Sequence, residues 1–166
     1  MIVLLKLAKQ GRVRVILDNA ALHKSTDKKT APEDAFEKLF DKVDKDSILR
    51  GHFGRYAHDK VLIVSDKAAD APKGARKVLT GSTNYSVTGL YVNSNHVILF
   101  DDPKVAQKYS EVFELAWNID VKNAAFQKSP LANQTFSFST NGVPATDISF
   151  SPHTKPVADK IMGALV

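Results

Sequence analysis

The chain has 166 residues, of which 43% are hydrophobic and 25% are charged, so it fits a compact globular domain and excludes a fibrous or disordered chain. The formal net charge of +5 favours phosphate-bearing partners without identifying one, and the absence of cysteine excludes disulfides, a thiolate nucleophile and a cysteine-based zinc site. Because Lys6 and Lys9 interrupt the apolar opening, and no later apolar run spans a bilayer, we expect membrane contact to be peripheral at most. The sequence does not indicate the cellular compartment.

Helical and strand patterns alternate along the first part of the chain. Residues 4–8 read as the end of a helix, and residues 13–17 form a short apolar run typical of a buried strand. Thr30 and Glu33 have the spacing of a capping box, and the apolar spacing that follows predicts a helix through residue 43. This order is typical of an α/β fold.

Three apolar runs rich in branched residues then predict central strands at residues 60–64, 77–80 and 96–100. Asp101 to Pro103 can start a helix, and apolar residues at helical spacing continue it to Trp117. The predicted architecture is therefore an α/β domain with a mixed central sheet flanked by helices.

The remaining chain differs in composition from this domain. Periodicity is lost over residues 119–146, which are rich in Asn, Ser, Thr, Gln and Pro and predict a linker. Order resumes over residues 147–166, where residues 148–150 alternate like a strand and a helix starts near Pro156. We therefore expect a domain over residues 1–118, a linker over 119–146, and a C-terminal strand-helix extension over 147–166 that is a candidate start of a second domain.

The most informative residues lie in two short motifs. His58-x-Lys60 leads into a predicted buried strand, and Gly81-Ser82-x-Asn84 follows about one strand later. This combination resembles the HKD signature of the phospholipase D superfamily, and the resemblance extends over most of residues 1–118. It implies one phospholipase D-like half-domain that lacks its first strand and helix.

The residue types suit attack on a phosphodiester. Imidazole changes charge near neutrality, so His58 can act as a nucleophile and form a phosphohistidine. Lys60 is two residues away, on the same face if both lie in a strand, and can neutralise the phosphate oxygens. Asn84 offers an amide donor, Ser82 can bond the imidazole or a phosphate oxygen, and Gly81 lets the backbone approach closely.

Other candidate residues are less tightly defined. The HKD spacing places an aspartate at position 65, where this chain has Ser65, so we expect Asp66 to fill that role only if a bulge brings it into place. His52 and Arg55 are candidate substrate-binding residues because they flank a glycine-containing loop before His58. Structural or surface roles are expected for the remaining histidines, which are His23, His96 and His153.

The resemblance implies a phospholipase D-type hydrolase or transphosphatidylase that needs no metal or cofactor. Phospholipid is the first expected substrate class; alternatives are a nuclease of the same superfamily acting as a homodimer, which the basic charge would suit, and an inactive phosphate-binding module, which Ser65 would suit. The superfamily site joins two HKD motifs. A second half is therefore expected, either from the same longer chain or from a second copy.

Overall fold

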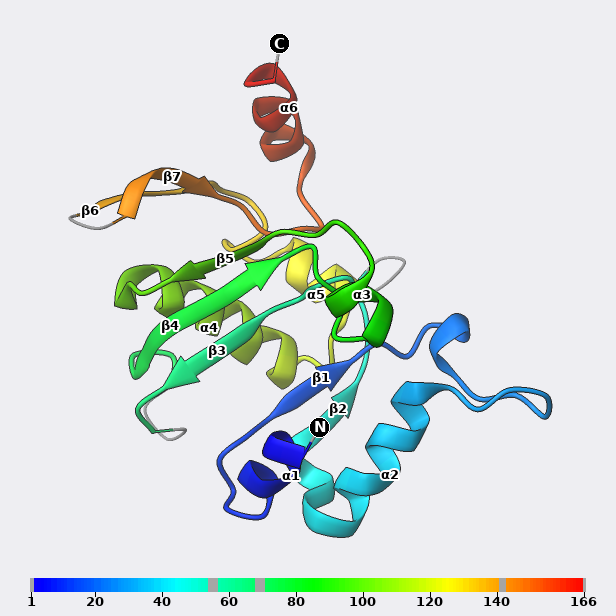
Figure 1. The fold of residues 1–166 in the computed structure, drawn as a ribbon. Helices are drawn as coiled ribbons and strands as arrows, with labels where there is room; N and C mark the ends of the chain where they lie inside the picture. Colours follow the sequence, from blue (N-terminus) through cyan, green and yellow to red (C-terminus); the bar gives the residue numbers. More distant parts are fainter. Residues whose placement is uncertain (1, 54–56, 68–70, 141–142, 166) are drawn as a thin grey trace. The chain divides into compact units, whose positions relative to one another are not determined.

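A computed structural model describes residues 2–53, 57–67, 71–140 and 143–165 (Figure 1). The chain divides into two compact units, of which unit 1 comprises Met1–His58 and Leu115–Ser129, and unit 2 comprises Asp59–Glu114 and Pro130–Val166. Each unit contains helices and strands, so the predicted α/β class is confirmed. Parallel and antiparallel strand pairs both occur, but in separate sheets.

Unit 1 is built around a two-stranded parallel sheet. Its elements are α1 (Ile2–Ala8), β1 (Val15–Leu17), η1 (Ala21–His23), α2 (Pro32–Asp44), η2 (Lys45–Ser47), β2 (Ile48–Arg50) and α5 (Asn123–Gln127). In β1 and β2, Val15 pairs with Ile48 and Leu17 with Arg50. The strand β2 was not predicted, because its three residues are too few to give a period-two pattern.

Helix α2 is confirmed, but its predicted capping box is wrong. The N-cap is Ala31, with no side-chain cap hydrogen bond, and Pro32 occupies the first turn. Glu33 does not reach back to the helix start; its carboxylate instead lies 2.8 Å from Nδ1 of His23. Glu33 is thus engaged with another segment instead of capping the helix, while the proline and the acidic first turn still favour helix initiation here.

Unit 2 contains a three-stranded antiparallel sheet in the order β3-β4-β5. Its elements are β3 (Leu62–Ser65), β4 (Ala75–Gly81), α3 (Val87–Tyr91), β5 (Val97–Phe100), the first twelve residues of α4 (Pro103–Asn118), β6 (Phe136–Thr140), β7 (Val143–Ile148) and α6 (Lys155–Gly163). Val78 in β4 and Val105 in α4 are both fully buried. Helix α4 runs along one face of this sheet (Figure 1).

Regular elements also occur where the sequence predicted a linker. Over residues 119–146 the structure has α5, β6 and most of β7, and β6 pairs antiparallel with β7. The signal was present, since Phe136 and Phe138 alternate with serines, but it was hidden among polar residues. Within unit 2, the ring of Phe150 packs edge-on against the ring of Tyr109 of α4, with 5.0 Å between the ring centroids. The proposed boundaries at 118 and 146, and a second domain over 147–166, stay predictions.

Candidate active site

The segment that carries His58 and Lys60 precedes the sheet rather than lying in it. Residues 57–61 belong to no helix or strand, and β3 begins only at Leu62, so the prediction that the pair lies on one face of a strand is wrong. The His58 side chain is exposed, whereas Lys60 is only 8% exposed. Lysine side chains are seldom this buried in proteins unless they are paired, so Lys60 is unlike an ordinary surface lysine.

Within unit 2, Lys60 and the Gly81 motif belong to the same end of the sheet. The antiparallel register pairs Leu62 with Leu79 and Ile63 with Val78. Antiparallel strands run in opposite directions, so a step back along one strand matches a step forward along the other. Continued by two residues past the Leu62–Leu79 pair, this register would bring Lys60 opposite Gly81. The ladder therefore runs toward Lys60 on one strand and toward Gly81 on the other.

Backbone and side-chain hydrogen bonds fix the loop that follows Gly81. The Ser82 N–H donates to the His96 carbonyl at 3.1 Å, and Ser82 Oγ accepts from the His96 N–H at 3.1 Å. The same hydroxyl donates to Asn95 Oδ1 at 3.0 Å, and Asn95 Nδ2 donates to the Gly89 carbonyl at 2.9 Å. Ser82 thus has a structural role in this loop; its predicted catalytic role stays a prediction.

Two glycines allow the close packing around Asn84. Gly81 has φ +151°, and a Cβ there would lie 2.2 Å from the His96 carbonyl oxygen. A Cβ on Gly89 would lie 2.2 Å from the carbonyl oxygen of Asn84. Both obstacles are backbone atoms that cannot move aside easily. The exposed side chain of Asn84 therefore projects from a loop whose backbone is packed against α3.

Asp66 lies at the other end of β3. Its N–H donates to the Gly74 carbonyl at 3.0 Å, and its carboxylate pairs with Nε of Arg76 at 2.6 Å on an exposed surface. The register does shift between Val64 and Ser65, as a bulge requires. The ion pair gives Asp66 a contact at the end of the strand remote from Lys60, and its catalytic role stays a prediction.

The two predicted substrate-binding residues beside His58 have different outcomes. His52 Nδ1 forms a hydrogen bond with Asn19 Oδ1, within unit 1. Arg55 lies outside the described residues. His23, expected to be structural, is held by Glu33 as described above, while the His96 side chain is exposed. Binding roles for His52 and Arg55 stay predictions.

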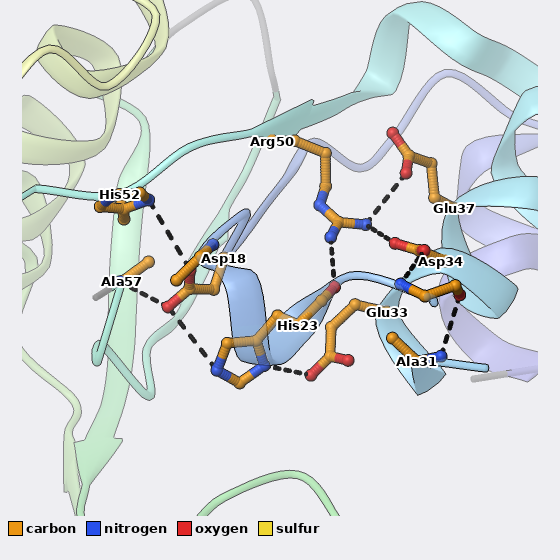
Figure 2. A network of polar contacts seen from close by, with 11 residues as sticks. Asp18, His23, Ala31, Glu33, Asp34, Glu37, Arg50, His52 and Ala57 are labelled. Atoms are coloured by element: carbon orange, nitrogen blue, oxygen red, sulfur yellow. Dashed lines mark hydrogen bonds and ion pairs between the residues drawn. The ribbon is translucent and has the colours of Figure 1, made fainter. Parts of the chain in front are cut away.

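A buried carboxylate that the sequence analysis missed lies at the end of β1. Asp18 is 8% exposed, and its Oδ1 accepts a hydrogen bond from the Ala20 N–H at 2.6 Å. Its Oδ2 accepts a hydrogen bond from the Ala57 N–H at 2.8 Å (Figure 2). His23 Nε2 and His52 Nδ1 lie 3.9 and 3.8 Å from the same carboxylate. A lone acidic residue directly after a buried strand was the available signal.

Comparison with known protein families shows which superfamily the chain belongs to. A family model described as "Cardiolipin synthase, PLD-like domain" matches residues 2–117, which include both motifs. The chain belongs to the phospholipase D superfamily. No curated protein and no solved structure matched the chain in the same comparisons.

Membership of the phospholipase D superfamily confirms the resemblance drawn from the two motifs and supports phosphodiesterase chemistry in general. Among the described residues, no group of three or more histidine, aspartate or glutamate side chains is arranged to hold a metal ion. None of the helices in the described ranges is long and apolar enough to cross a membrane.

Proposed function

We propose that this phospholipase D-like chain cleaves or transfers a phosphodiester through a covalent phosphohistidine on His58. The observation that carries the proposal is the family match across residues 2–117, which spans His58, Lys60 and the Gly81 to Asn84 loop. The register of β3 and β4 leads toward Lys60 on one strand and Gly81 on the other, at the same end of the sheet. This supports a phosphate site to which Lys60 and the Gly81 to Asn84 loop both contribute.

The proposed reaction has two displacements at phosphorus. A nitrogen of the neutral His58 ring attacks the phosphorus, a P–N bond forms, and the P–O bond to the leaving alcohol breaks. Water or a second alcohol then attacks the phosphorus, which breaks the P–N bond and regenerates the imidazole. Lys60 and the Asn84 amide donate hydrogen bonds to the non-bridging oxygens, where negative charge accumulates in each transition state.

The leaving alkoxide needs a proton, and the proposed source is a second HKD half. That half comes either from the same longer chain or from a second copy of this chain, and its histidine would protonate the leaving alkoxide and then take a proton from the attacking water or alcohol. Measuring the mass of the protein in solution, together with the activity of diluted samples, distinguishes the two. A site completed by a second copy loses activity on dilution below the dimer dissociation constant.

Phospholipid is the proposed substrate class, supported by the description of the matching family, which names a lipid enzyme. A nuclease is the second candidate, favoured by the net charge of +5. A phosphate-binding module without turnover is the third, favoured by Ser65 at the position expected for aspartate. Phosphatidylcholine vesicles, plasmid DNA and a chromogenic phosphodiester, each with and without EDTA, separate the three.

The decisive variant is His58→Asn, which removes the nucleophile while keeping a polar side chain of similar reach. We expect turnover to fall by about 10⁴-fold or more, with the melting temperature unchanged because His58 is exposed. Acid-labile ³²P label should appear on the wild-type chain during turnover and be absent from the variant.

His153→Asn is the matched control, since His153 lies beyond the family-matched residues 2–117. It should retain wild-type turnover and label. Near-normal turnover in purified His58→Asn protein would eliminate the nucleophile assignment.

A further inference from the structure

We infer that Asp18 is a positioning residue for the His58 nucleophile, acting through the backbone N–H of Ala57. The inference rests on the proposed function, because it assigns Asp18 a task in the reaction of His58. Its physical basis is the 2.8 Å hydrogen bond from the Ala57 N–H to Asp18 Oδ2, all within unit 1 (Figure 2).

The Ala57 hydrogen bond matters because the segment around it has no regular secondary structure. Residues 57–61 belong to no helix or strand, and the β3 ladder begins at Leu62. The backbone of Ala57 is therefore fixed by a side chain rather than by a strand partner. Since His58 is the next residue, any shift of the Ala57 peptide moves the Cα from which the imidazole projects.

The carboxylate itself is held in place on both sides. Its Oδ1 accepts from the Ala20 N–H two residues further on, a local turn contact that orients the side chain. His52 Nδ1 lies 3.8 Å from Oδ1, and His23 Nε2 lies 3.9 Å from Oδ2. Each carboxylate oxygen thus accepts one backbone hydrogen bond and has one imidazole nitrogen nearby, and the Ala20 bond opposes the rotation that would release Ala57.

A second layer of contacts holds His23. Glu33 Oε1 lies 2.8 Å from His23 Nδ1, and the Arg50 guanidinium donates to the His23 carbonyl at 2.7 Å. Arg50 is in turn paired with Asp34 at 3.1 Å and Glu37 at 2.9 Å, both on α2. The position of Asp18 is thus tied to a helix, and rigid supports of this kind are what a nucleophile requires.

The consequence for the reaction follows from how steeply rate depends on placement. A misplacement of about 1 Å of a reacting group can cost roughly 10²-fold in rate. Asp18 does not touch the substrate in this scheme, so its loss should lower kcat and leave KM nearly unchanged. That split separates positioning from substrate binding.

The test compares Asp18→Asn with Asp41→Asn in the full chain. Asparagine at 18 keeps the volume but has one oxygen acceptor, so it cannot accept from both N–H groups with two oxygens. We expect the Ala57 amide to exchange with deuterium about tenfold faster and kcat to fall about 10- to 100-fold, with KM within twofold of wild type. Asp41→Asn, a change at an exposed residue of α2, should leave both readouts at wild-type values.

A second variant approaches the contact from the donor side, in case Asp18→Asn does not fold. Ala57→Pro removes the N–H and leaves Asp18 bound to Ala20, so it should lower kcat by a similar factor. Fast exchange of the Ala57 amide in wild type, or faster exchange in Asp18→Asn with unchanged kcat, overturns the inference. So does an equal loss of kcat in Asp41→Asn.

Titration with inorganic phosphate, followed by the NMR signal of the His58 ring, keeps this inference separable from the proposed function. A wild-type chain without turnover rejects the proposed function. If phosphate still shifts the His58 signal in wild type and in Asp41→Asn but not in Asp18→Asn, the positioning role stands. If phosphate moves the signal equally in all three, or in none of them, positioning fails as well.

Discussion

The Asp18 network in unit 1 and the Gly81 to Asn95 loop in unit 2 hold their candidate residues by different physical means. In unit 1, a buried carboxylate gathers N–H groups and histidines from separate segments. In unit 2, glycines without side chains let neutral backbone groups approach closely, and Ser82 and Asn95 complete the bonding. The first region should therefore respond to changes of charge, and the second to changes of volume.

After His58, the largest expected effect on turnover lies at Lys60, a buried cation of unit 2. Lys60→Met removes the ammonium and keeps an unbranched side chain of similar length, so it should lower turnover by about 10²- to 10³-fold. Steady-state kinetics on the chromogenic phosphodiester measures the loss, with circular dichroism to confirm folding. Lys77→Met is the control, because Lys77 pairs with Asp101 on an exposed surface. Equal losses in the two variants would contradict a specific role for Lys60.

Volume sensitivity is tested at Gly89. Gly89→Ala would place a Cβ 2.2 Å from the Asn84 carbonyl oxygen, so the loop or α3 must shift. We expect a loss of about 2 kcal/mol in the free energy of unfolding, measured by urea titration. Gly163→Ala is the matched control, since a Cβ there meets nothing within 4 Å and should not lower stability. A neutral Gly89→Ala would show that close packing does not govern this loop.

Asn95 tests the polar part of the same loop. Asn95→Ala removes the partner of Ser82 Oγ and the donor to the Gly89 carbonyl, so we expect a loss of about 1 kcal/mol in unfolding free energy. Asn93→Ala, an exposed residue nearby, should change it by less than about 0.5 kcal/mol. If both variants are equally stable, the Asn95 bonds do not hold the loop.

The smallest expected effect is a pH dependence in unit 1. Hydrogen bonds from Ser25, and to a lesser degree Arg50, hold the pKa of Asp34 below its ordinary value of 3.8. Its charged form therefore stabilises the folded chain fully above that pH, and this contribution is lost as the pH falls through the lowered pKa. Melting temperatures over about pH 2 to 6 should show a shallower acid decline in Asp34→Asn than in wild type, while Asp41→Asn, an exposed change on α2, should follow wild type.

Local pattern predicted the long elements because their signals are repeated many times. Helix α4 has apolar residues over four turns and a cap in which Asp102 accepts from the Val105 N–H at 3.0 Å. Strand β5 was equally clear as an uninterrupted apolar run. The short elements β2 and α3 carry three and five residues, too few for periodicity to identify.

The motif residues of the candidate site could be selected from the sequence, but the residues that hold them in place could not. His58, Lys60 and the Gly81 to Asn84 loop stood out because residue type and spacing together define the motif. Asp18 did not, since its partner Ala57 is 39 residues away and donates a backbone N–H that no side-chain pattern records. Hydrogen bonds to backbone groups depend on the fold and leave little trace in a single sequence.

The link from Asp18 to Ala57 also has a kinetic consequence. One hydrogen bond closes a loop across 39 residues, and closing such a loop costs chain entropy that local contacts cannot repay. We therefore expect the contact to form only after β1, β2 and α2 have assembled. In a growing or partly unfolded chain, the imidazole of residue 58 would lack the hydrogen bond that positions it. Catalytic activity would therefore appear late in folding and be among the first properties lost on local unfolding.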